Sequence, residues 1–270
     1  GTTYEGGKLK KTLGRGTVFR LKNGRFKVLH VFAGPPADGE FPMSGVLLGS
    51  DNILYGTAQF GQSNGSVESN VVFSVDTEGR HYRILRVLTN SYAFSYSIPE
   101  LIEGSDKALY GCFVQTLFKL SKDGQTYQEL HTFDSDLLNG PLLLASDGKL
   151  YGVTAYGTGN HGTVYRINPD GSGFETLFVF PESAASGSLP NGPLAEGQDG
   201  MVYGVTSDNT PEIFRLNKDG TGFEILHYLD QGSPGGGLML GSDGAFYGTT
   251  ITGGSNGAGT AFRFYFTPDN

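Results

Sequence analysis

Tryptophan is absent from this chain of 270 residues, and cysteine occurs only once. A single cysteine, Cys112, excludes an internal disulfide, and the other repeats carry Thr or Val at its position in a strand. We therefore expect a small buried side chain there and not a nucleophile. Without tryptophan, any stacking on a sugar ring falls to tyrosine and phenylalanine.

Positive charge and long apolar runs are also scarce. The chain has 19 Lys and Arg against 27 Asp and Glu, a formal net charge of -8. This balance provides no field to hold a polyanion, so we do not expect nucleic acid as a partner. No apolar run approaches the roughly 20 residues of a membrane-spanning helix, and we see no signal peptide. What precedes residue 1 stays open.

Familiar catalytic signatures are missing as well. The chain has no Gly-x-Ser-x-Gly elbow, no His-Glu-x-x-His and no cluster of Cys and His at metal-ligand spacing. Helical periodicity is absent throughout. The sequence therefore leaves open whether the protein is an enzyme.

Glycine, in contrast, is abundant, with 43 residues that fall at fixed places in a repeated phrase. The phrase contains Asp-Gly, then Tyr-Gly, then Gly-Thr-x-Phe-Arg, then Leu-His-x-Phe. Its tyrosines are Tyr55, Tyr110, Tyr151, Tyr203 and Tyr247, spaced by 41 to 55 residues. Such spacing is typical of blades or solenoid turns.

The clearest copy predicts four strands. Apolar or alternating runs cover Pro141–Ala145, Lys149–Thr154, Gly162–Ile167 and Phe174–Phe180, and turn residues separate them. Four short strands joined by tight turns form an antiparallel meander. The first run is the most apolar, which predicts the innermost strand, and the fourth alternates with charged residues, which predicts the outermost.

Repetition of this meander predicts an all-β fold, a β-propeller of four-stranded antiparallel blades in one domain over residues 1–270. We expect five blades, because five innermost strands are visible. Six strands of the third type are present, since Gly16–Leu21 duplicates Gly259–Phe264. We therefore expect Phe26–Phe32 to complete the last blade opposite Gly237–Phe264, so that the N- and C-terminal strands close the ring. Six blades is the alternative.

The repeated phrase resembles the GloVer tandem repeat of secreted bacterial proteins. The best local match is Phe246–Phe262, with Tyr247-Gly248-Thr249-Thr250, Gly253-Gly254 and Gly259-Thr260-Ala261-Phe262. This resemblance implies a β-propeller and an extracellular or cell-surface setting. It implies no activity. The copy at Tyr110–Phe133 departs most from the pattern, because it has lost the Gly-Gly loop.

The unequal loops of one face are the candidate binding site, since variable loops on a rigid scaffold often carry function. One connector, 89–97, places Tyr92, Phe94 and Tyr96 among small polar residues, a composition that suits a sugar or a protein contact. Another loop offers Asn160 and His161. We take these five residues as candidate ligand contacts.

The same face supplies the candidates for chemistry. Fold analogy with propeller lyases that act on uronate-containing polysaccharides points to His161, Tyr92, Tyr96 and Arg15 as candidate catalytic residues. Asp208 and Asn209 are candidate oxygen ligands for a calcium ion, although no spaced calcium motif joins them. His30, His131 and His227 repeat at one strand position, which predicts a structural role.

Three functions follow from these patterns. The first is a secreted or cell-surface binding module that holds a glycan or a protein on its variable-loop face. The second is a propeller enzyme that acts on polysaccharide as a lyase or glycoside hydrolase. The third is a structural or assembly subunit that self-associates through a rim strand. Ligand identity, oligomeric state and any metal requirement are not defined by the sequence.

Overall fold

The computed structural model describes residues 1–8, 14–42, 44–63, 67–89, 100–134, 138, 140–155, 161–181, 189–207, 210–229 and 232–265, and of residues 61–63, 67 and 68 only the backbone. The chain forms two compact units, Gly1–Glu129 and Leu130–Asn270. Our expectation of one domain over residues 1–270 stays a prediction. No helix in the described ranges has the length and apolarity needed to cross a membrane.

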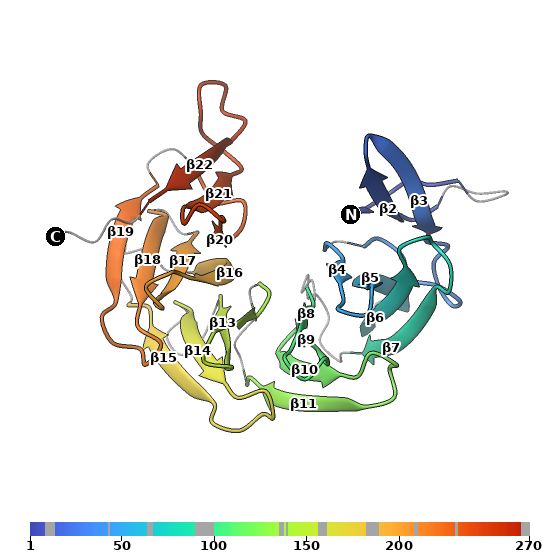
Figure 1. Cartoon of the computed structure of the whole chain (residues 1–270), viewed down its shortest axis with the longest axis horizontal. Coiled ribbons are helices and arrows are strands. Elements are labelled where there is room, and N and C mark those ends of the chain that lie inside the picture. The colour runs from blue at the N-terminus through green and yellow to red at the C-terminus, as the bar shows by residue number, and fades with distance from the viewer. Residues whose placement is uncertain are drawn as a thin grey trace. The chain divides into compact units, whose positions relative to one another are not determined.

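The first unit contains three antiparallel sheets, and the last strand of the third sheet extends into the second unit. The first sheet contains β1 (Thr2–Thr3), β2 (Thr17–Lys22) and β3 (Arg25–Val31) (Figure 1). The second contains β4 (Leu47–Leu48), β5 (Ile53–Ser63), β6 (Val67–Asp76) and β7 (Arg83–Thr89). The third contains β8 (Ile102–Glu103), β9 (Leu109–Phe113), β10 (Thr116–Leu120) and β11 (Tyr127–Thr132).

The second unit contains the other three sheets. The fourth sheet contains β12 (Leu143–Leu144), β13 (Leu150–Thr154), β14 (Thr163–Ile167) and β15 (Glu175–Val179). The fifth contains β16 (Pro190–Glu196), β17 (Val202–Thr206), β18 (Glu212–Leu216) and β19 (Glu224–Tyr228). The sixth contains β20 (Met239–Leu240), β21 (Phe246–Thr250) and β22 (Thr260–Phe264).

The fold is an all-β β-propeller of six blades, each with three to four antiparallel strands. Our prediction of five blades was wrong. We expected the N-terminal strand to complete the last blade and so close the ring, but β3 pairs with β2 in a first blade of its own, and β20, β21 and β22 form a separate sixth sheet.

A tight hairpin explains this difference. Asn23 and Gly24 join β2 to β3, and both have positive φ, 51° and 71°. Two left-handed residues in a row are the geometry of a type I′ turn, whose twist suits two directly paired strands. The Asn-Gly turn therefore pairs β3 with β2 in one hairpin.

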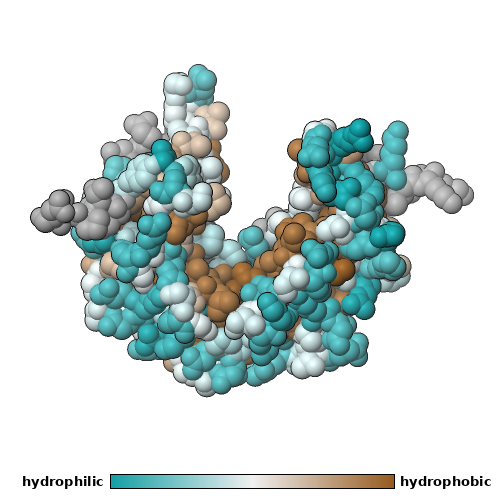
Figure 2. All heavy atoms as spheres, in the orientation of Figure 1, coloured by the Kyte–Doolittle hydropathy of each residue, from teal (hydrophilic) through white to brown (hydrophobic). Residues whose placement is uncertain are grey.

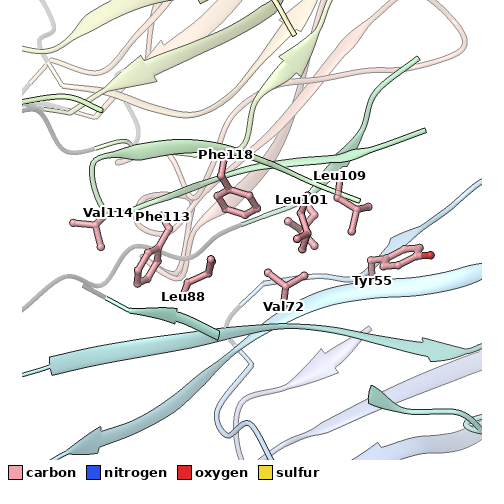
Figure 3. Packing of buried hydrophobic residues seen from close by; sticks show 9 residues of the cluster. Tyr55, Val72, Leu88, Leu101, Leu109, Phe113, Val114 and Phe118 are labelled. Atoms are coloured by element: carbon pink, nitrogen blue, oxygen red, sulfur yellow. The ribbon is translucent and has the colours of Figure 1, made fainter. Parts of the chain in front are cut away.

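The hydrophobic core lies between successive sheets. In the first unit, Tyr55 and Val72 of the second blade face Phe118 of the third blade across a cluster of buried side chains (Figure 3). Tyr55 is 2% exposed, and Phe118 is completely buried. Burial of each such side chain contributes about 1.5 to 3 kcal/mol, so the contact between blades is a main source of stability.

A bulge in the fourth strand also joins neighbouring blades. In the pairing of β2 with β3, Leu29 is the extra residue, because Val18 pairs with His30 and Phe19 pairs with Val28. A Cβ added to Gly79, in the turn of the next blade, would lie 2.5 Å from the Leu29 carbonyl oxygen. Only glycine allows this approach. Gly124 and Gly220 meet the bulged Leu85 and Leu177 in the same way.

Burial changes across each sheet as the sequence predicts. The second strand of a blade, as in β13 and β17, consists of buried residues, whereas the fourth strand, as in β15 and β19, contains only exposed and half-buried residues. Hydrophilic residues accordingly cover the rim of each unit where these outer strands lie (Figure 2). The fourth strand is therefore the outermost one.

Candidate functional site

The loops of the variable face in the first unit are held by backbone hydrogen bonds. The amide of Phe41 donates to the carbonyl oxygen of Arg15 at 2.7 Å, and the amide of Glu40 donates to Gln59 at 2.7 Å. The first bond joins the connector between β3 and β4 to the loop between β1 and β2, and the second joins this connector to β5. The connector is thereby fixed to both neighbouring blades.

Two aromatic rings meet on this fixed loop. The rings of Tyr4 and Phe41 stack with centroids 5.0 Å apart and an angle of 26° between their planes. Tyr4 is 49% exposed, and the Arg15 guanidinium carbon lies 6.0 Å from the Phe41 ring centroid. We call Tyr4, Phe41 and Arg15 the aromatic platform.

A buried carboxylate lies beside the platform. Glu40 is only 5% exposed, and its Oε2 accepts a hydrogen bond from Nη1 of the half-exposed Arg15. A buried carboxylate is costly unless it is paired. Arg15 is therefore held by Glu40, while 51% of its side chain stays exposed. A Cβ added to Gly34, which has φ of +85°, would lie 3.0 Å from the Arg15 side chain.

Asp38, which lies in the same connector, binds backbone amides of that connector. Its carboxylate accepts hydrogen bonds from the amides of Ala33 and Gly39, at 2.9 and 2.7 Å, and lies 2.9 Å from His30 Nε2. Burial alone would raise the pKa of Asp38, but His30, Tyr82 and the Ala33 amide outweigh it and lower that pKa. The charged Asp38 carboxylate thus holds the backbone of the connector in place.

The His30 ring is stacked on Tyr82 of the next blade, with centroids 3.6 Å apart and nearly parallel planes. The Tyr82 hydroxyl is buried near Asp38 without a well-formed hydrogen bond among the described residues. Burial first, and then the Asp38 carboxylate, raise the pKa of Tyr82 far above its usual range. This tyrosine therefore stays neutral.

The second unit repeats the backbone of this site but not its rings. There the amide of Leu189 donates to the carbonyl oxygen of His161 at 3.2 Å. Both residues that donate, Phe41 and Leu189, have positive φ, 47° and 64°. By the repeat, His161 is the counterpart of Arg15, and Ala155 is the counterpart of Tyr4. These positions carry no stacked aromatic pair.

Of the predicted site residues, the structure describes only Arg15 and His161. Arg15 lies in the first unit and pairs with Glu40, whereas His161 lies in the second. The other candidates are outside the described residues: Tyr92, Phe94, Tyr96, Asn160, Asp208 and Asn209. Across the described ranges, no group of three or more His, Cys, Asp or Glu side chains could hold a metal ion.

Sequence reasoning missed Tyr4, Phe41 and Glu40. A signal for Tyr4 was present, because it directly follows Gly1-Thr2-Thr3, where other copies carry Ala155, Ser207 or Ile251. The remaining copies carry Gln59 and Val114 there, so an aromatic ring at this position breaks the pattern. No sequence signal joins Phe41 to Tyr4, which is distant in the chain.

The opposite face carries the same contacts in five blades. In each, the tyrosine hydroxyl of the second strand donates to the aspartate of the preceding Asp-Gly or equivalent turn at 2.7 or 2.8 Å. Burial and this carboxylate raise the pKa of Tyr151 and of Tyr203 to about 12. Such regular contacts belong to the scaffold.

Two of the three repeated histidines, His30 and His131, also pack between blades, whereas His227 is exposed. The His131 ring stacks on Phe174 at 3.7 Å between centroids, as His30 stacks on Tyr82, and Phe178 takes the same place on Phe223 at 3.9 Å. Because phenylalanine can replace histidine in this stack, the contact depends on a flat ring and not on imidazole chemistry. These pairs agree with the structural role that repetition predicts.

Comparison with family models matches the chain to the Gloeobacter/Verrucomicrobia repeat over residues 1–212 and 140–269. The resemblance seen in the sequence is therefore confirmed. Among curated proteins, none gives a significant match.

Solved structures that resemble the chain have diverse titles. A putative 6-phosphogluconolactonase from Bacteroides fragilis is 18% identical, with a TM-score of 0.60 over 98% of this chain and 82% of that one. A chain of a nidogen/laminin complex is 14% identical, with a TM-score of 0.53 over 93% and 90%. A luciferin-regenerating enzyme is 12% identical, with a TM-score of 0.52 over 82% and 71%. At these identities, the likeness concerns the fold alone.

Proposed function

This chain belongs to the Gloeobacter/Verrucomicrobia repeat family, and we propose that it is a binding module that holds a glycan on the aromatic platform of its first unit. We place it outside the cell or on the cell surface, in line with the resemblance to repeats of secreted bacterial proteins. Family membership supplies no activity, and the similar structures range from a nidogen/laminin complex to proteins titled as enzymes. The proposal therefore rests on the site.

The observation that carries it is the half-exposed Tyr4 ring stacked on Phe41 beside the pair of Arg15 and Glu40. A sugar ring has apolar C–H faces and hydroxyl edges. Aromatic rings offer a rigid apolar surface for such a face, and tyrosine adds a polar group at its end. The guanidinium has further N–H donors for hydroxyls.

The platform is also built before a ligand arrives. Backbone bonds from Phe41 and Glu40 hold the connector, and Asp38 closes it from within. A site that is already ordered loses little conformational entropy on binding, which favours affinity. This order supports a binding role for the loop over one as a passive link between blades.

The experiment is a glycan-array screen with the complete chain, followed by calorimetry of the best ligand against wild type, Tyr4→Ala and Ile251→Ala. Ile251 occupies the repeat position of Tyr4 in the sixth blade and is 66% exposed, so it is the matched control. We expect Tyr4→Ala to weaken binding roughly tenfold or more, the loss typical of an interface hot spot. Ile251→Ala should bind like wild type.

Several results would overturn the proposal. They are the absence of any glycan ligand, equal binding by Tyr4→Ala, and binding of a protein in place of a glycan. Release of unsaturated products or reducing ends from a polysaccharide by the wild-type chain would replace binding with catalysis.

A further inference from the structure

The net charge of -8 is unevenly distributed along the chain. Residues 1–31 hold eight of the 19 Lys and Arg residues but only one of the 27 Asp and Glu residues. The eight cations are Lys8, Lys10, Lys11, Arg15, Arg20, Lys22, Arg25 and Lys27. Of these, Lys10 and Lys11 lie outside the described residues. Salt screens charges that are more than about 8 Å apart at physiological ionic strength, so distant acidic residues do not cancel this local excess. The first blade can therefore attract anions although the whole protein is acidic.

Four of these cations share one face of the hairpin formed by β2 and β3 (Figure 1). Arg20 pairs with Lys27, and Lys22 pairs with Arg25, in the register of the two strands. Directly opposite residues lie on one face of a sheet, and so do alternate residues of a strand. Lys22, Arg25 and Lys27 are exposed, and Arg20 is half-buried. We call these four residues the basic face.

The basic face departs from the repeat. In the fourth blade, Arg166 lies opposite Glu175 and forms an ion pair with it at 2.7 Å, and the fifth blade has an equivalent pair. By the repeat, Arg20 is the counterpart of Arg166, and Lys27 takes the place of the glutamate. Like charges that lie directly opposite each other destabilise a sheet. A change that costs stability in the scaffold indicates a role outside it.

Glu78 of the second blade neutralises only part of this charge. It accepts hydrogen bonds from Arg20 Nη1 and from Lys27 Nζ, the second at 3.0 Å. These bonds lower the pKa of Glu78, so its carboxylate is ionised at neutral pH. Within the described ranges, Lys22 and Arg25 form no ion pair, and the other two cations pair only with Glu78. The basic face therefore keeps an excess of positive charge.

The basic face lies on the same chain segment as the aromatic platform. Arg15 of the platform precedes β2 by two residues, and Arg20 follows five residues later. An extended strand rises about 3.4 Å per residue, so roughly 17 Å separates their backbones. Both contact the second-blade side, because Arg15 accepts from the amide of Phe41 and Arg20 Nη1 donates to the carbonyl oxygen of Thr77 at 2.8 Å. An oligosaccharide of several rings can span this distance.

The cations of the first blade suit carboxylate groups. A guanidinium is planar and can bind a carboxylate through two parallel N–H donors. Arg15 already binds the carboxylate of Glu40, and the exposed Arg25 offers a second guanidinium. A polysaccharide of acidic sugars carries carboxylates at regular intervals beside rings that can stack.

We propose that the glycan held by this protein is a carboxylated polysaccharide, which stacks on the aromatic platform and extends to the basic face, where Arg20, Lys22, Arg25 and Lys27 bind its carboxylates. This inference rests on the proposed function and specifies the class of its ligand.

The test compares the best-binding uronate oligosaccharide of the glycan array with its methyl ester, which keeps the sugar rings but removes the charges. In calorimetry with the complete chain, we expect the ester to bind about tenfold more weakly than the acid. The affinity for the acid should also fall at least about fivefold between roughly 50 and 500 mM NaCl, because salt screens the charges. The affinity for the ester should not depend on salt.

The variant Lys27→Glu restores the Arg-Glu pair of the fourth and fifth blades, so its thermal unfolding midpoint should be equal to that of wild type or higher. It should bind the acid about fivefold more weakly and the ester as wild type does. Lys149→Glu, in the second unit, changes the net charge by the same amount and should bind both ligands like wild type. Arg25→Gln, at an exposed position, gives a second measurement and should weaken the acid about threefold.

Four results would overturn this inference: equal binding of acid and ester, an affinity for the acid that does not depend on salt, unchanged binding of the acid by both Lys27→Glu and Arg25→Gln, or tighter binding of a DNA oligonucleotide of equal charge. Selection of neutral or sulfated glycans by the array would also overturn it, but would leave the platform in place if Tyr4→Ala weakens their binding. Binding of the acid that Lys27→Glu weakens and Tyr4→Ala does not would support the basic face and refute the platform.

Discussion

The amide of Phe41 donates a 2.7 Å hydrogen bond to the carbonyl oxygen of Arg15, and this one contact brings together two loops that are separate in the sequence. The bond from Leu189 to His161 repeats it in the second unit at 3.2 Å. The backbone of the site is thus part of the repeat, whereas the stacked rings of Tyr4 and Phe41 are an addition to it. This difference supports a specialised role for the first unit.

Replacement of Asp38 by asparagine should destabilise the protein by roughly 1 to 3 kcal/mol, because buried donors lose a charged acceptor. The pKa of Asp38 is lowered in the folded state, so its contribution is present above the unfolded value of about 4 and is lost as pH falls through the folded value. Denaturant unfolding from pH 7 to pH 2 should show the difference between wild type and Asp38→Asn shrink with acid.

The exposed Glu5 provides the control for this prediction, since Glu5→Gln changes a carboxylate outside the connector. It should leave stability within about 0.5 kcal/mol of wild type. A difference for Asp38→Asn that stays constant with pH would contradict our account of the connector.

Replacement of His131 by phenylalanine should keep its stack and reduce the sensitivity of the fold to acid. Burial lowers the pKa of His131, so its neutral form is favoured in the folded state. The stability of wild type should therefore fall as pH drops below the unfolded value of about 6.5. Phe178 already fills this position in the fourth blade. Thermal unfolding between pH 7.5 and pH 5 should decline less steeply for His131→Phe, and an unchanged slope would refute this explanation.

Two glycines with similar backbone angles should respond differently to alanine. Gly79 has φ of +81° and a Cβ there would lie 2.5 Å from the Leu29 carbonyl, whereas Gly24 has φ of +71° with nothing within 4 Å. Gly24→Ala should cost about 1 to 2 kcal/mol from backbone strain alone. Gly79→Ala should cost a further 1 to 3 kcal/mol from overpacking. Equal losses in urea unfolding would show that the contact between blades has no energetic weight.

Much of the fold follows from the sequence, because each strand carries its own pattern and each turn its own residues. The spacing of Tyr151 and Tyr203 and the Asp-Gly turns define the blade. Blade number does not follow from this pattern, since a fourth strand fits any third strand of the repeat. Only the Asn23-Gly24 turn distinguishes the true partner of β3, and that local signal was outweighed by the match between the chain's ends.

The candidate site was less predictable, for a physical reason. Repetition identifies His30 and the turn aspartates as scaffold, and departure from it can indicate Tyr4. The stack of Tyr4 on Phe41 depends on a left-handed residue in a connector held by bonds from two blades. Such a contact has no periodicity, so no pattern in the sequence predicts it.

The absence of tryptophan allows the most direct test of the glycan proposal, because a variant with one tryptophan has a single reporter. Tyr4→Trp keeps a ring on the platform, and Ile251→Trp places one at the matched position of the sixth blade. When the best array ligand is titrated, the fluorescence of Tyr4→Trp should shift and saturate, and that of Ile251→Trp should stay constant. Constant emission from Tyr4→Trp while the glycan binds would contradict the proposed platform.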